Sequence, residues 1–568
     1  MPMHRSTRGA LRRGAAAASA LLVASALAQT PAGPAAPAAA APASRTETLR
    51  FDILEFVVTG NTVLSIEAIE RAVYPFLGPG RTIDDAEGAR KALERAYQDA
   101  GFLSVTVELP PQRVGSGELR LVVQEAPVDR LRVTGAQWFL PSQIAGQVPS
   151  VAVGSVPNFN DLQSELATVA RQTADREVTP VIAAGERPGT MNVELKVQDK
   201  APLNGFVELN SKQSQNSERG RLEASTSWDN LFQKRHSIGA YWYYSPRRPD
   251  DANVLALTYR LPFGDERDAG DSLAISFTRS DSNTPTALGG ATVTRGTVFG
   301  LRWRDELRPA GPFTHALNWS LTYRDLQDRN VSVAGFGSDA PPLRYPSFGI
   351  SYELQRSGEV ALRQSSLQAG IVFGLGALNQ REVDCEGRVV EQFACKRSGA
   401  RSTFQVVNLG ASHREPLGGQ WIANVRAQAQ FSSGPLVPAE QITLGGVESV
   451  RGYYDGEQAG DFAVALRAEV DAPRLYETSG TVLRALAFYD RATLLRKEPL
   501  PGEIGRTQMG SVGLGLRLDS RAGLQARLDW AYILFDTRRV ESTRAVVPVS
   551  GAAAGRDQRW EFSVRQSF

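Results

Sequence analysis

The chain has 568 residues, with 63 Lys and Arg against 61 Asp and Glu, and a formal net charge of +2. This length is enough for several domains, and the charge balance lacks the strong basic excess of most nucleic-acid-binding proteins. No run of about 20 apolar residues occurs, so the sequence offers no transmembrane helix beyond a possible N-terminal signal.

The N-terminal region has the three parts of a secretory signal peptide, which we expect over residues 1–28. Arginines at positions 5, 8, 12 and 13 precede an apolar stretch over 15–27, and Ala26 and Ala28 provide a small-x-small cleavage site. A disordered Ala-rich tail is the alternative. Removing these four arginines from the formal charge of +2 leaves about −2 for the mature chain. Residues 29–50 are rich in Ala and Pro and are predicted to form a linker.

Two copies of a small α+β pattern follow. Residues 51–126 read as strand, two helices and two strands, with the second helix beginning near Asp84 and ending before Gly101. Residues 127–199 repeat this theme more loosely, with a helix beginning near Asp161. Together they form an internal repeat of about 75 residues per copy, which has to be recognised before the fold is assigned.

From residue 200 to residue 568, segments of about ten residues alternate apolar and polar side chains. The apolar faces carry aromatic residues near their ends, and the opposite faces are charged. A soluble sandwich also alternates, but its polar face is rarely so charged and so long. We therefore predict a lipid-facing wall around a polar lumen. Sixteen segments are expected, at 203–211, 219–229, 235–245, 252–262, 271–280, 294–304, 313–324, 344–354, 360–374, 402–413, 420–432, 460–472, 481–491, 509–519, 522–535 and 558–568.

An even number of strands closes a bacterial barrel without a free edge. If the N-terminus is periplasmic, the long polar connections face outside, and Cys385 and Cys395 fall in the fifth external loop. These are the only two cysteines, and an exported protein meets an oxidising compartment, so we expect a local disulfide between them. A zinc site is not expected, because two cysteines without a nearby His give too few ligands.

The sixth external loop contains the stretch 444–453, which opens with Gly445 and Gly446 and ends in Val450-Arg451-Gly452-Tyr453. An arginine that packs inward must find a carboxylate or several acceptors, because an unpaired buried charge is costly. A glycine-containing hairpin with an exposed arginine is the alternative.

The chain resembles the TpsB family of two-partner secretion transporters, of the FhaC, ShlB and HecB type, within the superfamily that includes BamA. The resemblance is carried by the signal peptide, two POTRA-like repeats, sixteen barrel segments, the Val450-Arg451-Gly452-Tyr453 motif, and an alternating last segment that ends on Phe568. The terminal Phe568 resembles the outer-membrane assembly signal.

The resemblance implies an ion pair between Arg451 and an aspartate on strand 13. Here that segment contains Phe488 and Asp490, which share one face because side chains alternate along a strand. Ala492 stands where the family pattern has glycine. Family members often carry an N-terminal helix that plugs the pore, but residues 29–50 are too rich in Pro for us to expect one.

The expected function is export of a large partner protein, similar to a TpsA haemolysin or adhesin, across the outer membrane. The POTRA-like repeats would capture the unfolded partner in the periplasm by strand addition, and outer-membrane lipid and the barrel assembly machinery are the other expected partners. A BamA-like assembly factor is the alternative function, although such proteins usually carry more than two POTRA repeats. A passive porin is disfavoured because porins lack periplasmic repeats. We expect no catalytic residue, cofactor or metal, because the four His are scattered and no Walker-type loop occurs.

Overall fold

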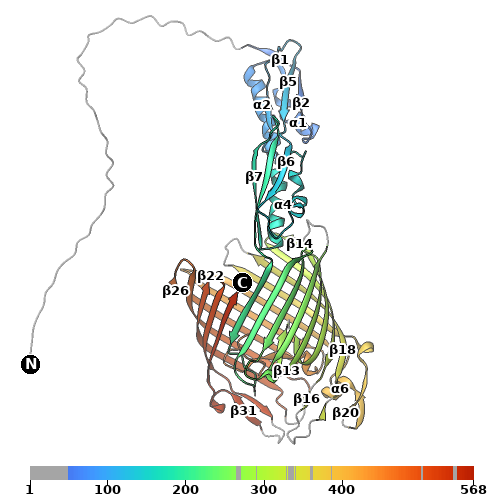
Figure 1. The fold of residues 1–568 in the computed structure, drawn as a ribbon, viewed down its shortest axis with the longest axis vertical. Coiled ribbons are helices and arrows are strands. Elements are labelled where there is room, and N and C mark those ends of the chain that lie inside the picture. The colour runs from blue at the N-terminus through green and yellow to red at the C-terminus, as the bar shows by residue number, and fades with distance from the viewer. Residues whose placement is uncertain are drawn as a thin grey trace, which may run out of the picture.

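The computed structural model describes residues 49–568, apart from 216, 264–269, 289–290, 328, 331–337, 340, 358–362, 386, 500–502 and 541–545. The expected signal peptide and most of the linker lie outside the described residues. Two small α+β domains are stacked on one end of a large barrel (Figure 1). None of the described helices is long and apolar enough to cross a membrane.

The first α+β domain packs two helices against a mixed three-stranded sheet of order β2-β5-β4, in which β2 and β5 are parallel. Helix α2 begins with a reciprocal capping box between Thr82 and Asp85. Leu93 and Tyr97 of this helix are fully buried against Leu121 of the sheet. Its elements are β1 (Phe51–Ile53), β2 (Glu55–Thr59), α1 (Ile66–Val73), β3 (Gly78–Arg81), α2 (Ile83–Asp99), β4 (Thr106–Glu108) and β5 (Glu118–Gln124).

The second α+β domain repeats this arrangement with a sheet of order β6-β8-β7. Asn158 joins the two domains, because its side-chain oxygen accepts from the first amides of α4 while its side-chain nitrogen donates to the carbonyl of Ala100 at the end of α2. Its elements are β6 (Val128–Thr134), α3 (Pro141–Gly146), α4 (Phe159–Gln172), β7 (Arg176–Ala184) and β8 (Met191–Asp199). The short helix α3 was not predicted from the sequence.

Sixteen antiparallel strands of the described chain form a closed barrel, which confirms the predicted fold class. Each predicted segment overlaps one of these strands, and several strands extend further than expected. The barrel strands are β9 (Leu203–Asn210), β10 (Arg221–Leu231), β11 (His236–Tyr244), β12 (Asn253–Pro262), β13 (Ser272–Leu288), β14 (Ala291–Ala310), β15 (Phe313–Leu326), β18 (Leu343–Ser357), β19 (Gln364–Gly374), β22 (Gln405–Gly418), β23 (Trp421–Ser432), β26 (Phe462–Glu477), β27 (Thr481–Leu495), β28 (Arg506–Ser520), β29 (Leu524–Ile533) and β32 (Gln558–Ser567).

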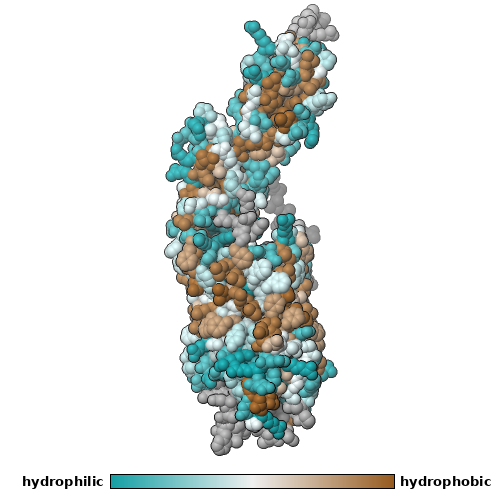
Figure 2. Space-filling view, turned by 90° about the vertical axis from the view of Figure 1, so that its right-hand side faces the viewer, coloured by the Kyte–Doolittle hydropathy of each residue, from teal (hydrophilic) through white to brown (hydrophobic). Residues whose placement is uncertain are grey.

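The barrel wall is apolar on the outside and polar within. Exposed leucines, valines and aromatics alternate along the strands with buried charged residues, as in β27, where Tyr489 is 42% exposed and Asp490 is fully buried. Figure 2 shows apolar side chains over the middle of the barrel wall, with hydrophilic side chains below them. This distribution is what a bilayer requires of a barrel.

The turn between β10 and β11 lies against the second α+β domain and therefore marks the periplasmic end. Gln233 accepts a hydrogen bond from the Leu140 amide at 3.1 Å and donates one to the Trp138 carbonyl at 3.0 Å. The ring of Trp138 also lies edge-on to that of Trp228, with centroids 6.0 Å apart. The opposite end, which carries the long loops, is therefore extracellular.

Candidate functional site in the barrel lumen

The loop between β23 and β26, here called loop 6 (residues 433–461), folds back into the barrel. Its two arms form a short antiparallel ladder, β24 (Ile442–Leu444) with β25 (Gln458–Gly460). Gly445 turns the chain at the end of this ladder with φ of +119°, and a Cβ there would lie 2.3 Å from the Tyr454 carbonyl oxygen. A side chain at this position would therefore prevent the two arms from approaching each other.

Arg451 is fully buried and is held by Asp490 of β27. Its Nε and Nη2 each donate a hydrogen bond to one carboxylate oxygen of Asp490 at 2.8 Å, and its backbone amide donates to the same carboxylate at 3.1 Å. The guanidinium carbon lies 3.4 Å from the centroid of the Phe488 ring. The structure therefore brings together the three residues that the sequence pattern related, with a bidentate pair over an aromatic face.

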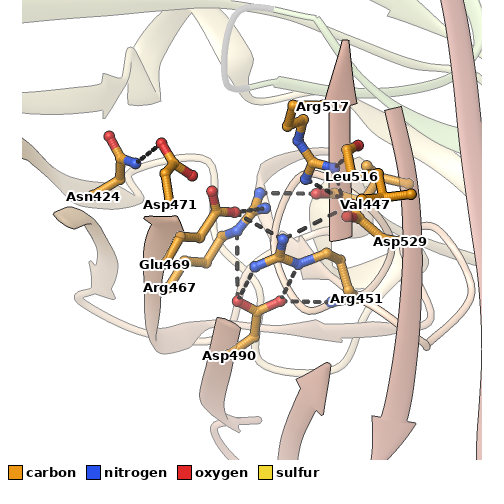
Figure 3. A network of polar contacts seen from close by, with 10 residues as sticks. All are labelled: Asn424, Val447, Arg451, Arg467, Glu469, Asp471, Asp490, Leu516, Arg517 and Asp529. Atoms are coloured by element: carbon orange, nitrogen blue, oxygen red, sulfur yellow. Dashed lines mark hydrogen bonds and ion pairs between the residues drawn. The ribbon is translucent and has the colours of Figure 1, made fainter. Parts of the chain in front are cut away.

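Further charged residues surround this pair (Figure 3). Nη1 of Arg451 lies 2.8 Å from Glu469 of β26, and Arg467 of the same strand lies 3.7 Å from Asp490. Asp529 of β29 lies 3.9 Å from Arg451 and is itself paired with Arg517. These four neighbours, Arg467, Glu469, Arg517 and Asp529, were not predicted. The only signal for them was their placement on charged strand faces.

Apolar contacts hold the remainder of the motif. Val450 and Tyr453 are both fully buried, and they pack in one cluster with small residues of the inner wall, among them Ala465 and Ala492. The Tyr453 hydroxyl donates to the Phe535 carbonyl at 2.8 Å and accepts from the Gly510 amide at 3.1 Å. Burial raises the pKa of this hydroxyl to about 12, so it stays protonated as a donor. Ala492, which departs from the family's glycine, is accommodated in this cluster.

Gly452 brings the loop backbone against the last strands. Its φ is +92°, and a Cβ would lie 3.1 Å from Ile533 and 3.2 Å from Ala531. Its amide donates to Glu561 of β32 at 3.3 Å. Every residue of the motif therefore contacts the inner wall.

Loop 6 also contacts the first extracellular loop. The amide of Gln213 donates to the Asp455 carboxylate at 2.7 Å, and the Asp455 amide donates to the Gln213 carbonyl at 2.9 Å. The guanidinium of Arg559 lies 4.7 Å from the centre of the Tyr454 ring and donates to the Gln213 side chain at 3.1 Å. Segments from both ends of the barrel sequence thus meet over loop 6.

Cys385 and Cys395 form a disulfide in the fifth extracellular loop. The bridge closes a small unit made of β20 (Glu382–Cys385), β21 (Arg388–Glu391) and α6 (Gln392–Lys396). Phe393 of α6 is buried against the ring of Tyr345, with centroids 5.0 Å apart. The disulfide unit is therefore packed onto the barrel rim.

Arg397, which directly follows this unit, forms an ion pair with the fully buried Asp461 at the base of loop 6. The same carboxylate accepts from Gln441 at 3.0 Å and from the backbone amides of Leu436 and Lys497 at 3.0 and 2.7 Å. Burial alone would raise the pKa of Asp461, but the hydrogen bonds from Arg397 and these other donors outweigh it and hold the pKa below its ordinary value. Three extracellular loops are joined at this carboxylate.

Phe568 closes the barrel beside the first strand. Its amide and carbonyl both pair with Gly205 of β9, at 3.0 and 3.1 Å. Its side chain is 58% exposed and has the same strand parity as Phe562 and Val564, which are also exposed. The terminal aromatic therefore belongs to the outward, lipid-facing set.

Comparisons with known proteins agree on one family. Residues 51–126 match the family model "POTRA domain, ShlB-type", and residues 344–518 match "Haemolysin secretion/activation protein ShlB/FhaC/HecB". The first α+β domain and part of the barrel thus both resemble proteins of the ShlB/FhaC/HecB type. The Outer membrane transporter CdiB of Escherichia coli is 24% identical over 491 residues, which cover 83% of this chain and 77% of CdiB. The Heme/hemopexin transporter protein HuxB of Haemophilus influenzae is 21% identical over 428 residues, covering 73% and 70% of the two chains.

Solved structures share the fold of this protein. CdiB from Escherichia coli superposes with a TM-score of 0.59 at 19% identity, covering 93% of both chains. BamA from Haemophilus ducreyi lacking POTRA domains 1–3 superposes with a TM-score of 0.53 at 14% identity, covering 92% of this chain and all of that one. At these identities the likeness concerns the fold alone.

Proposed function

We propose that this protein exports a large partner protein, similar to a TpsA haemolysin or adhesin, from the periplasm to the cell surface. The observation that carries the proposal is the placement of Arg451: a loop from the extracellular side is held by a buried ion pair inside a barrel whose periplasmic end carries two POTRA domains. The related CdiB and HuxB are both named as transporters. The proposed activity is transport, without an enzymatic step.

The second POTRA domain offers a surface for capture of an extended segment. In its sheet, β7 is an edge strand that pairs on one side with β8 and, among the described residues, has no strand on the other. Val181 and Ile182 of β7 are 37% and 39% exposed. An unfolded partner would add a strand to this edge and place apolar side chains on these residues.

Passage through the lumen requires loop 6 to leave its present position. The loop contacts β26, β27, β29 and β32 through the ion pairs and hydrogen bonds described above, so it occupies the lumen that the partner would use. We therefore assign Val450, Arg451, Gly452 and Tyr453, with Phe488 and Asp490, the role of holding loop 6 in a defined resting position.

Membrane insertion is the second part of the proposal. Phe568 ends an alternating strand with its ring outward, and we assign it the role of a recognition signal for the barrel assembly machinery, with outer-membrane lipid as the lasting partner of the barrel's apolar face.

Deletion of the gene in its native host tests this function. We expect one large protein, or a small set, to disappear from the cell surface and culture supernatant, as measured by quantitative mass spectrometry. Wild-type protein supplied in trans should restore it, and the Arg451→Ala variant should not, at equal amounts in the outer membrane. A general fall in many outer-membrane barrel proteins would instead support the BamA-like assembly function and would refute specific export.

A further inference from the structure

The outer surface of the barrel has a cavity near the extracellular ends of β11 and β12, beside the middle of β13. Its volume is about 580 Å³, and it is lined by Trp242, Asn253, Leu255, Arg279 and Asp281. Trp242 is paired with Leu255, and Leu255 with Arg279, so these three side chains lie on one face of three adjacent strands. Trp242 and Leu255 are 38% and 40% exposed, which identifies this face as the outward one.

The cavity lies toward the outer leaflet of the membrane. Strand β13 begins at the periplasmic end with Ser272, and Arg279 is seven positions further along. At a rise of roughly 3.4 Å per residue this is roughly 24 Å of strand. For a strand tilted by about 40°, the height is roughly 18 Å of an apolar band that is about 25 Å tall. Arg279 therefore lies in the outer third of the apolar band, from where its long side chain extends toward the headgroups.

The chemistry of this surface changes along the membrane normal. On the periplasmic side of the cavity the outward residues are apolar, and the rings of Phe277 and Phe299 lie 5.0 Å apart. Within the cavity the exposed Arg279 forms no ion pair with any described residue. The nearby Asp281 carboxylate is already occupied, because Nε of Arg295 donates to it at 2.7 Å. The cavity therefore holds one cation on the extracellular side of an apolar surface.

Trp242 gives the cavity a fixed aromatic wall. Its ring stacks on Tyr244 with centroids 4.8 Å apart and planes 25° apart, and its Nε1 donates to Asn253 at 3.1 Å. A flat, oriented ring next to a cation suits a sugar that carries a negatively charged substituent, because the apolar face of the sugar packs on the ring.

We propose that this cavity binds the phosphorylated sugar headgroup of a glycolipid of the outer leaflet. The guanidinium of Arg279 holds a phosphate, since its planar fork matches phosphate oxygens. Trp242 packs against the sugar, and the acyl chains lie over Phe277 and Phe299. A phospholipid would supply a phosphate for Arg279 but no sugar to pack on Trp242.

The test uses the full-length protein, purified in detergent and titrated with bisphosphorylated lipid A, with bound lipid counted by native mass spectrometry. We expect one tightly bound lipid A, and about tenfold weaker binding for both R279Q and W242A. R388Q is the matched control, because Arg388 is an exposed extracellular arginine in β21, away from the barrel wall, and it should bind as the wild type does. A heat-dependent shift in gel mobility confirms that each variant is a folded barrel.

Two further probes on the wild-type protein distinguish the source of the phosphate. Dephosphorylated lipid A should bind about as weakly as lipid A binds to R279Q. Phosphatidylglycerol, which has a phosphate but no sugar ring, should not displace lipid A at equal concentration. Equal binding of lipid A by wild type and R279Q would overturn the proposal, as would displacement by phosphatidylglycerol.

Discussion

Replacing Arg451 with Ala should release the tip of loop 6 while leaving the barrel folded. The substitution leaves Asp490 fully buried and removes the shortest cationic contact of Glu469. Removing one partner of a buried ion pair typically costs about 3–5 kcal/mol. Because Arg467 lies 3.7 Å from Asp490 and retains part of the compensation, we expect the lower end, about 3 kcal/mol. That is a factor of about 100 in the equilibrium between docked and released loop.

The reporter for this equilibrium is a cysteine at position 450, introduced as Val450→Cys in both backgrounds. Val450 is fully buried, so a thiol there reacts only when the tip opens, and the two native cysteines are already joined. On intact cells, a membrane-impermeant maleimide should label the Arg451→Ala protein about 100-fold faster. The Arg388→Ala variant, which removes an exposed arginine from another extracellular loop, should label like the parent.

A second substitution separates the ion pair from the simple loss of a side chain. The Arg451→Ala/Asp490→Ala protein has no buried carboxylate at position 490 that lacks its arginine. Labelling of the cysteine at position 450 should therefore be slower than in Arg451→Ala alone. If Arg451→Ala labels within twofold of the parent, the ion pair does not hold the loop, and the reasoning above fails. The gel mobility shift on heating checks that every variant is a closed barrel.

Two more predictions concern the extracellular loops. The pKa of Asp461 is lower in the folded protein than in the unfolded one, so its carboxylate stabilises the folded protein fully at pH values above its unfolded-state pKa of about 3.9. This stabilisation is lost as the pH falls through the lower pKa of the folded protein. Hydrogen exchange of residues 433–444, corrected for intrinsic rates, should therefore accelerate as the pH is lowered from 5 to about 2. In the Asp461→Asn protein the same residues should exchange fast at every pH. An exchange rate of the wild-type protein that does not change with pH would contradict this. Thiol alkylation of the mature protein should modify neither Cys385 nor Cys395 before reduction and both after it, and finding both free would exclude the bridge.

The barrel was predictable because its signal is local. A residue's face on a strand is decided by its parity, so the alternation around Tyr489 and Asp490 is visible without knowledge of any partner strand. The short helix α3 gave no such signal, because its six residues begin with Pro and bury only Ile144. The strand after helix α2 also illustrates a limit: β4 begins only at Thr106, after a turn that the sequence pattern does not place.

The sequence predicted the pair of Arg451 and Asp490 but not its charged neighbours, because their contacts depend on the register between adjacent strands. The pairing of Arg467 with Asp490 depends on β26 and β27 being aligned so that these two residues are opposite each other. A shift of two residues would keep every side chain on its face and still separate them. The contact between Arg397 and Asp461 joins two irregular loops 64 residues apart, where no periodic pattern exists.

Loop 6 is fastened at two separate places, and this separation bears on how it moves. Asp461 holds the base of the loop at the extracellular rim through Arg397, while Arg451 holds the tip through Asp490. The two fastenings share no residue, so loss of the tip contact leaves the base contacts intact. Because the base remains attached, a released tip stays close to its site, and the cost of returning is only the ordering of one loop. We therefore expect release and return of the tip to be reversible within a barrel that stays closed, which is the behaviour that repeated export through one lumen requires.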